Sequence, residues 1–162
     1  MAELDHADVV IIGGGVVGCA IFRRLALANL KPLLLERGAD ILSGASKANS
    51  AILHTGFDAP TGSLEVACMQ AGYRAYLDIH AHLNLPLVET GALVVAWDEA
   101  QMQRLPDIVA QAHANGVADV MQIGRDEVLR REPNLAGHVL GAVHVPREHL
   151  IDPWSAPLAY VL

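Results

Sequence analysis

Three glycines near the start of the chain have the spacing of a dinucleotide-binding turn. Gly13, Gly15 and Gly18 follow a predicted strand at 7–12 and open a predicted helix at 15–29. In such a turn the first glycine permits the tight change of direction, the second lets a pyrophosphate approach the backbone, and the third lets the helix lie close to the strand. The helix N-terminus then offers N–H groups and a partial positive charge to the phosphates. The spacing therefore predicts a nucleotide site, in preference to a glycine-rich turn that merely closes a buried unit.

An acidic residue stands where the ribose of such a cofactor would lie. Glu36 ends the next predicted strand, 32–36, and follows Gly18 by 18 residues. A carboxylate at this position accepts hydrogen bonds from ribose hydroxyls and disfavours a cofactor with a 2′-phosphate. The cofactor is therefore not expected to be NADP.

A small, polar segment at 37–62 is long for a connection inside a compact domain. Loops of this length are usually functional or disordered. Its stretch Gly44–Ser50 contains small residues that suit a backbone wrapping closely around a ligand. Ser46 or Asn49 is placed to cap a short helix whose N-terminus would face a second phosphate. The alternative is a mobile surface loop.

The rest of the chain alternates between helical and strand-like patterns. Apolar residues at helical spacing predict a helix that starts after Ser63 and ends near Leu83. After Leu85-Pro86 the pattern predicts strand, helix, strand, helix and strand, at 87–97, 99–115, 120–123, after a cap at Asp126, and at 138–145. Within the first of these helices, Asp98 and Gln101 resemble a capping box and Pro106 is expected to restart the helix.

These patterns predict an α/β chain in three parts. Residues 1–85 form a Rossmann-like, nucleotide-binding βαβ part, and 86–150 form a smaller α+β segment. A final segment at 151–162 begins a helix near Asp152 that is still apolar at Leu162, which is an unusual end for a complete domain.

Composition excludes several classes of protein. The net charge of −7 and the lack of a basic cluster argue against nucleic acid as a partner. Cys19 and Cys68 are expected to be reduced thiols in the core, and no cysteine or histidine spacing suits a metal. The acidic start, Met1–Asp8, is unlike a signal peptide, and no apolar stretch approaches the roughly 18 residues of a membrane span. A cytoplasmic protein is expected, and peripheral attachment to a membrane is compatible with the sequence.

Several segments together resemble the D-amino-acid-oxidase-like superfamily of FAD-dependent oxidoreductases. The resemblance points in particular to the glycerol-3-phosphate dehydrogenase branch and its relatives that oxidise 2-hydroxyacids. It runs over essentially the whole chain, as the N-terminal portion of a longer protein, and Gly44–Ser50 is its more selective part. The matching segments are DVVIIGGGVVG at 8–18, LLLER at 33–37, GASKANS at 44–50 with HTG at 54–56, TGALVVA at 90–96 and EPNL at 132–135.

This resemblance implies FAD, and not NAD, as the cofactor. The segment Ser46–Ser50 would wrap the pyrophosphate and lead toward the flavin, with His54 beside the flavin ring. The segment 86–150 would cover the substrate. No catalytic base is assigned; His54 is the one candidate, although a structural role in the flavin loop is favoured. The cofactor-binding residues that the resemblance implies are Gly13, Gly15, Gly18, Glu36, Arg37, Ser46, Asn49, Ser50 and His54.

The implied reaction is hydride transfer from a C–H beside a hydroxyl to the flavin, with a small hydroxy substrate, phosphorylated or not, and an unidentified electron acceptor. The alternatives are an amine or amino-acid oxidase of the same superfamily, a non-catalytic remnant or subunit that works with a complementary chain or a second copy, and an NAD-dependent dehydrogenase. Later strands of the sheet and the residues that grip the substrate are expected beyond this incomplete portion. Residues 1–162 alone are therefore predicted to have weak or no activity.

Overall fold

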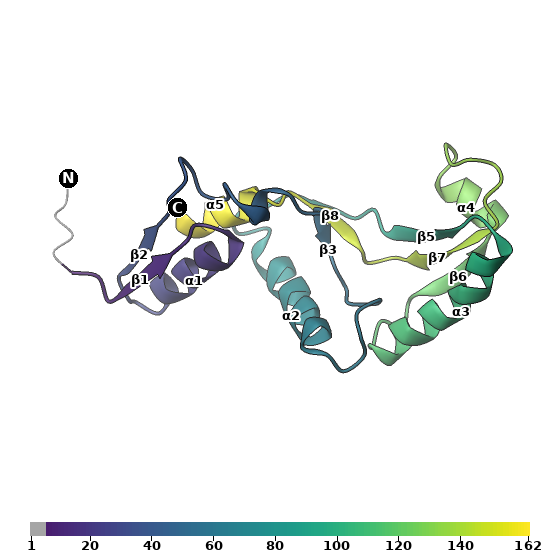
Figure 1. Cartoon of the computed structure of the whole chain (residues 1–162), viewed down its shortest axis with the longest axis horizontal. Helices are drawn as coiled ribbons and strands as arrows, with labels where there is room; N and C mark the ends of the chain where they lie inside the picture. The colour runs from purple at the N-terminus through teal and green to yellow at the C-terminus, as the bar shows by residue number, and fades with distance from the viewer. Residues whose placement is uncertain (1–5) are drawn as a thin grey trace. The chain divides into compact units, whose positions relative to one another are not determined.

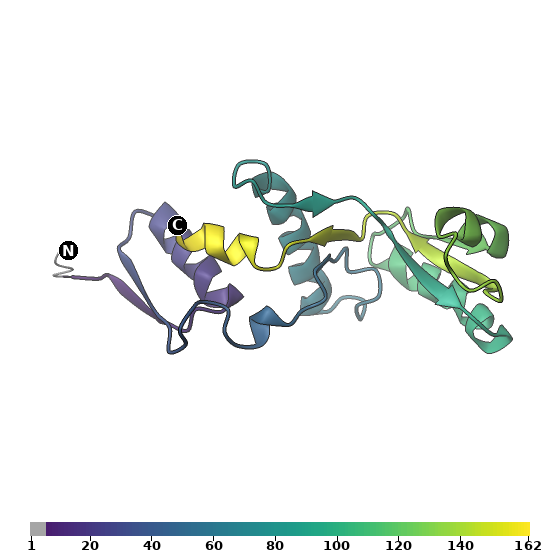
Figure 2. The same ribbon diagram turned by 90° about the horizontal axis from the view of Figure 1, so that it is seen from above.

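The computed structural model describes residues 6–162 and divides into two compact units. The first unit comprises the chain up to Ala51 together with Ala81–Pro86 and Ile151–Leu162. The second comprises Ile52–His80 and Leu87–Leu150. Figures 1 and 2 show the elements of both units along the chain.

The predicted division at 1–85, 86–150 and 151–162 stays a prediction. The compact units differ from it in one respect, because they group Ile52–His80 with the second unit. Of the N-terminal stretch that is unlike a signal peptide, residues 1–5 lie outside the described residues.

The first unit is built on a parallel βαβ motif, as predicted. Strands β1 (Val9–Ile12) and β2 (Pro32–Leu35) pair in parallel along their whole length, and helix α1 (Val16–Leu27) connects them. Helix α5 (Ser155–Val161) packs along α1, as both ribbon views show (Figures 1 and 2). The only other element of this unit among the described residues is the short 3₁₀ helix η1 (Ala45–Lys47).

The end of α1 shows why the chain reverses there. Asn29 takes a left-handed conformation with a φ of 60°. The N–H groups of Asn29 and Leu30 then reach back to the carbonyls of Ala26 and Leu25, at 2.9 and 3.1 Å. This pattern satisfies the last carbonyl groups of the helix, and β2 begins at Pro32.

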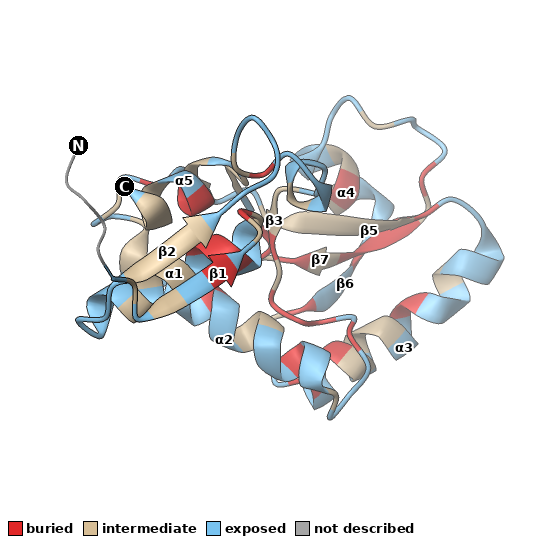
Figure 3. Ribbon diagram, turned by 60° about the vertical axis from the view of Figure 1, so that its left-hand side comes forward, coloured by how far each residue is buried: buried red, intermediate tan, exposed pale blue. Residues whose placement is uncertain are grey.

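The second unit contains an antiparallel sheet in the order β5–β7–β6. Its strands are β5 (Ala92–Ala96), β7 (Gly141–Val145) and β6 (Met121–Gly124). Helices α3 (Glu99–Ala114) and α4 (Arg125–Arg131) pack against it. Figure 3 shows that β7, the central strand, is buried along most of its length.

The two faces of this sheet carry separate apolar clusters. Val143 and Val145 face one cluster and Ala142 the other, as the alternation of a strand requires. The cluster on the α3 face contains Phe57, Ala96, Leu105, Ala112, Val117, Val120, Val143 and Val145. The cluster on the α4 face contains Ile123, Val128, Val139 and Ala142. The second unit therefore holds a core of its own.

A second small sheet, formed mostly by residues of this unit, was not predicted. It has the order β3–β8–β4, with β3 at Ile52–Leu53, β8 at His149–Ile151 and β4 at Leu87–Val88. Strands this short give no periodicity to read in a sequence. Gly91, with a φ of 66°, divides the predicted strand at 87–97 into β4 and β5.

Helix boundaries follow the capping residues in most cases. Ser63 caps α2 (Leu64–Ile79), as predicted, and the helix ends four residues before the predicted Leu83. The Asp98 side chain accepts a hydrogen bond from Gln101 N at 2.8 Å, which confirms the predicted N-cap of α3. The Gln101 side chain in turn accepts one from the backbone N–H of Trp97.

Three local predictions are wrong. Helix α3 continues through Pro106 without restarting there. Gly124, not Asp126, is the N-cap of α4, so Asp126 falls inside the first turn. Cys68 is exposed on α2, whereas Cys19 is fully buried as expected. Helical spacing alone does not show which face of a helix is covered.

Candidate functional site

The glycine-rich turn between β1 and α1 depends on missing side chains. Gly13 has a φ of 108°, and the space beside it is open. A Cβ atom on Gly18 would lie 1.9 Å from the carbonyl oxygen of Gly13. Strand, turn and helix therefore approach so closely that position 18 admits no side chain.

The N-terminus of α1 is open to an anion except at the N–H of Val16, which donates to the Ser46 hydroxyl. Its N-cap is Gly15, which has no side chain to accept a hydrogen bond, and its first turn contains no acidic residue. The first N–H groups of a helix have no partner within the helix, and they carry a partial positive charge. The turn therefore offers donors, charge and space that fit a pyrophosphate.

Glu36 follows β2 and lies against this turn. Its Oε2 accepts a hydrogen bond from Gly14 N at 2.6 Å, and its Oε1 accepts one from Gly38 N at 2.6 Å. The N–H groups of Gly38 and Gly14 hold the pKa of the Glu36 carboxyl below its usual range. Each carboxylate oxygen retains a second lone pair, so the residue can still accept from a hydroxyl.

Ser46 lies beside α1, but its role differs from the one predicted. Ser46 lies inside η1, whose N-cap is Gly44 with no side-chain hydrogen bond, so neither predicted residue caps this short helix. Instead the Ser46 hydroxyl accepts a hydrogen bond from Val16 N at 3.1 Å. It thus supplies the cap that Gly15 lacks.

Asn49 shapes the end of the same loop. Its side-chain amide donates to Ser46 O at 3.0 Å and accepts from Ala51 N at 2.8 Å. Arg37 and Ser50 are both exposed to solvent. The structure thus brings Gly13, Gly15, Gly18, Glu36 and Ser46 together, with Asn49 supporting the loop.

His54 belongs to the second unit, where it meets a buried acid. Its Nδ1 lies 3.0 Å from Oε2 of Glu148, a residue with only 3% of its side chain exposed. Thr55 donates to the other carboxylate oxygen through its N–H and its hydroxyl, at 2.6 and 2.7 Å. Sequence reasoning missed Glu148, because no motif links residues that are more than 90 positions apart.

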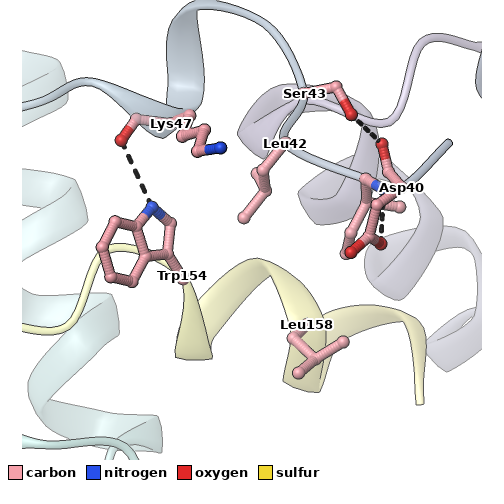
Figure 4. Close-up of a pocket in the computed structure, with 7 residues that line it drawn as sticks. Asp40, Leu42, Ser43, Lys47, Trp154 and Leu158 are labelled. Carbon is pink, nitrogen blue, oxygen red and sulfur yellow. Dashed lines mark hydrogen bonds between the residues drawn. The ribbon is translucent and has the colours of Figure 1, made fainter. Parts of the chain in front are cut away.

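A cavity of about 330 Å³ in the first unit lies between the loop before η1 and helix α5 (Figure 4). The Trp154 indole N–H donates to Lys47 O at 3.2 Å at one end of it. Its lining residues are Asp40, Ile41, Leu42, Ser43, Lys47, Trp154 and Leu158, and none of them is a predicted cofactor residue.

Two cavities in the second unit are lined by arginines, two of which are paired with acids. Arg131 lines a cavity of about 350 Å³ and pairs with Glu127 at 2.6 Å. Arg147 lines another of about 310 Å³ and donates two hydrogen bonds to Asp119, at 2.8 and 2.7 Å. Arg74 lines the same cavity as Arg147, is exposed, and forms no ion pair among residues 6–162.

Residues 6–162 contain neither a membrane-spanning helix nor a cluster of metal ligands. None of the helices there is long and apolar enough to cross a membrane. In the same part of the chain, no three histidine, cysteine or acidic side chains come together as metal ligands would.

Comparison with known proteins agrees with this geometry. A family described as FAD dependent oxidoreductase matches residues 8–161. The glycerol 3-phosphate dehydrogenase of Caloramator mitchellensis is 35% identical over 152 residues, which is 94% of this chain and 32% of that protein. A mitochondrial L-2-hydroxyglutarate dehydrogenase of Caenorhabditis briggsae is 32% identical, over 93% of this chain and 35% of its own length.

A solved structure shows the same fold. The dithionite-reduced L-alpha-glycerophosphate oxidase from Mycoplasma pneumoniae, with FAD bound, matches with a TM-score of 0.85 and 27% identity. The match covers 96% of this chain and 41% of that one. The chain thus spans about a third of the length of the curated relatives named above.

Proposed function

The chain belongs to the family of FAD-dependent oxidoreductases, and from this premise we propose that its first unit holds the ADP half of FAD for the oxidation of a small hydroxy substrate. The observation that carries the proposal is the Glu36 carboxylate, which bridges Gly14 and Gly38 beside the open N-terminus of α1.

Different residues of the turn are proposed to contact different parts of the cofactor. The N–H groups at the start of α1, other than that of Val16, would hold the pyrophosphate beside Gly13 and Gly15. Glu36 accepts from a ribose hydroxyl with its remaining lone pairs, and its charge disfavours a 2′-phosphate. Arg37, Asn49 and Ser50 stay predicted contacts, and His54 stays a predicted neighbour of the flavin.

When bound, FAD supplies a hydride acceptor at flavin N5. The contribution of this chain is to orient the cofactor through its ADP half. Ser46 caps α1 and so fixes the loop that follows the ribose site. Positioning of this kind is the main part that a protein plays in cofactor chemistry.

A hydroxy compound is the proposed substrate class. Both curated relatives and the FAD-bound structure are named for hydroxy substrates, glycerol 3-phosphate or 2-hydroxyglutarate. The amine alternative and the non-catalytic subunit stay predictions, as does a cytoplasmic location. Because the chain spans only about a third of the length of these relatives, residues 1–162 alone are expected to turn over glycerol 3-phosphate weakly or not at all.

Cofactor uptake tests the proposal directly. The full chain is incubated with FAD or NAD, freed of unbound ligand by gel filtration, and examined for the visible absorbance of flavin. We expect uptake of FAD, with competition by ADP, and a marked loss of affinity in Glu36→Gln. Glu89→Gln makes the same change at an exposed position in the second unit and is the matched control. Uptake of NAD without FAD would overturn the proposal.

Activity is measured on the same preparation with glycerol 3-phosphate and an artificial electron acceptor. The expected result is little or no reduction of the acceptor. Turnover at a rate usual for an enzyme would contradict the expectation about residues 1–162, while leaving the cofactor assignment intact.

A further inference from the structure

A buried carboxylate in the second unit has an unusual set of neighbours. Glu148 lies in the turn before β8, and only 3% of its side chain is exposed. A buried carboxylate is costly unless its oxygens are hydrogen-bonded or paired with a cation. The partners that the structure gives to Glu148 are Thr55 and His54.

The two carboxylate oxygens of Glu148 have different partners. Oε1 accepts from the N–H and the hydroxyl of Thr55, at 2.6 and 2.7 Å. These two bonds fix the plane of the carboxylate from one side. Oε2 is left facing the imidazole of His54, whose Nδ1 lies 3.0 Å away.

The Nδ1 atom of His54 has few possible hydrogen-bond partners. His54 Nδ1 is shielded from solvent and makes no hydrogen bond of good geometry among residues 6–162, although it lies 3.0 Å from Glu148 Oε2. The ring as a whole is 36% exposed, so its outer part is open to a ligand. The 3.0 Å separation is within hydrogen-bonding range of Oε2, and such bonds often become well aligned only when a ligand is bound.

We propose that Glu148 is a positioning residue that holds His54 in the tautomer with hydrogen on Nδ1 and leaves Nε2 as an acceptor. The tautomer of a histidine is set by the hydrogen bond that its other nitrogen makes. Carboxylates fix histidines in this way in catalytic and metal sites alike. Glu148 thus acts through His54 and touches no substrate itself.

The consequence for chemistry rests on the proposed function. Oxidation of a CH–OH group breaks a C–H and an O–H bond as the C=O bond forms. The hydride, with its electron pair, goes to the flavin, and the hydroxyl proton needs an acceptor. An Nε2 without hydrogen accepts that proton, whereas the opposite tautomer would present an N–H and accept nothing.

Nitrogen-15 NMR of the histidine rings tests the tautomer without any turnover. The full chain is labelled at histidine and studied at about pH 8.5, above the ordinary histidine pKa of about 6.5. His54 is assigned by its absence in His54→Gln. We expect the two-bond couplings between its ring hydrogens and ring nitrogens to show hydrogen on Nδ1 in the native chain. In Glu148→Gln, whose amide can donate to Nδ1, we expect the opposite tautomer to gain population.

Thr55→Val is the matched control. It removes a hydrogen bond to Oε1 but leaves Oε2 facing His54, so the tautomer should stay unchanged while stability falls. A native chain with hydrogen on Nε2, or a mixture that Glu148→Gln does not alter, would overturn the inference. If Glu148→Gln does not fold, the tautomer of the native chain decides alone.

Flavin uptake by the same samples keeps the two proposals apart. If the chain takes up FAD but His54 carries its hydrogen on Nε2, the positioning role of Glu148 is contradicted and the proposed function is still supported. If the expected tautomer is found but the chain takes up no FAD, the proposed function is contradicted, and with it the role of His54 as a proton acceptor. The Glu148–His54 arrangement would still be supported.

Discussion

The two units of this chain are stabilised in different ways. In the first, several side chains of the parallel strands are exposed, with Ile12 88% and Leu35 49% exposed, although Ile11 is buried. In the second, Val143 and Val145 at the centre of the sheet are fully buried. The first unit takes its shape from backbone hydrogen bonds and glycines, and the second from packed side chains. Substitutions in the first should therefore act mainly on ligand binding, and those in the second on stability.

The strongest test of this contrast is the turn of the first unit. Gly18→Ala places a Cβ 1.9 Å from the Gly13 carbonyl, which forces the turn open. We expect FAD uptake to be abolished, or weakened by more than about 100-fold, since each tenfold step is about 1.4 kcal/mol. Uptake is measured by flavin absorbance after gel filtration.

Gly72→Ala is the control for that substitution. Gly72 lies within α2, and a Cβ there would meet no atom within 4 Å. Alanine should instead stabilise the helix by about 0.5–1 kcal/mol and leave FAD uptake unchanged. Equal losses of uptake in both variants would show that the two units are not independent.

A second test compares core and surface packing. Leu105 is 2% exposed in the cluster under α3, so Leu105→Ala should lower the free energy of unfolding by about 2–5 kcal/mol. Ile12→Ala removes a similar apolar volume from an uncovered strand and should change it by about 0.5 kcal/mol or less. Urea unfolding followed by circular dichroism measures both. A comparable cost at Ile12 would show that the first unit also depends on packing.

The smallest expected effect concerns charge in the second unit. Arg147 holds the pKa of the Asp119 carboxyl below its usual range through two hydrogen bonds. Both side chains are more than a third exposed, so the pair contributes at most about 1 kcal/mol. Between the lowered pKa and the ordinary value of about 3.9, the unfolded chain binds more protons than the folded chain. The stabilisation is therefore complete at neutral pH and is lost as the pH falls below about 4.

Asp119→Asn should remove this pH dependence. The difference in unfolding free energy between the native chain and the variant is expected to be small at pH 7 and to shrink at acid pH. Asp107→Asn, on an exposed position of α3, serves as the control. A loss of several kcal/mol in Asp119→Asn would mean that electrostatics, and not packing alone, holds the second unit.

The sequence predicted those features that depend on neighbours along the chain. The βαβ motif follows from glycine spacing and apolar runs, and the caps at Ser63 and Asp98 follow from local hydrogen bonding. Contacts between distant residues were not predictable in this way. The Ser46 hydroxyl caps a helix 30 positions earlier, and Glu148 meets Thr55 across 93 positions. No local rule links such pairs, since only the folded chain brings them together.

The hydrogen bond from the Trp154 indole to Lys47 also has a spectroscopic consequence. The chain has two tryptophans, and they are divided between the units, with Trp154 in the first and Trp97 in the second. The ring centres of Trp97 and His138 lie 5.0 Å apart, whereas the Trp154 indole donates to Lys47 O. The two tryptophans therefore have different surroundings. Each unit thus carries its own intrinsic optical probe, and Trp97→Phe would leave only the emission of Trp154, at the start of α5 in the first unit.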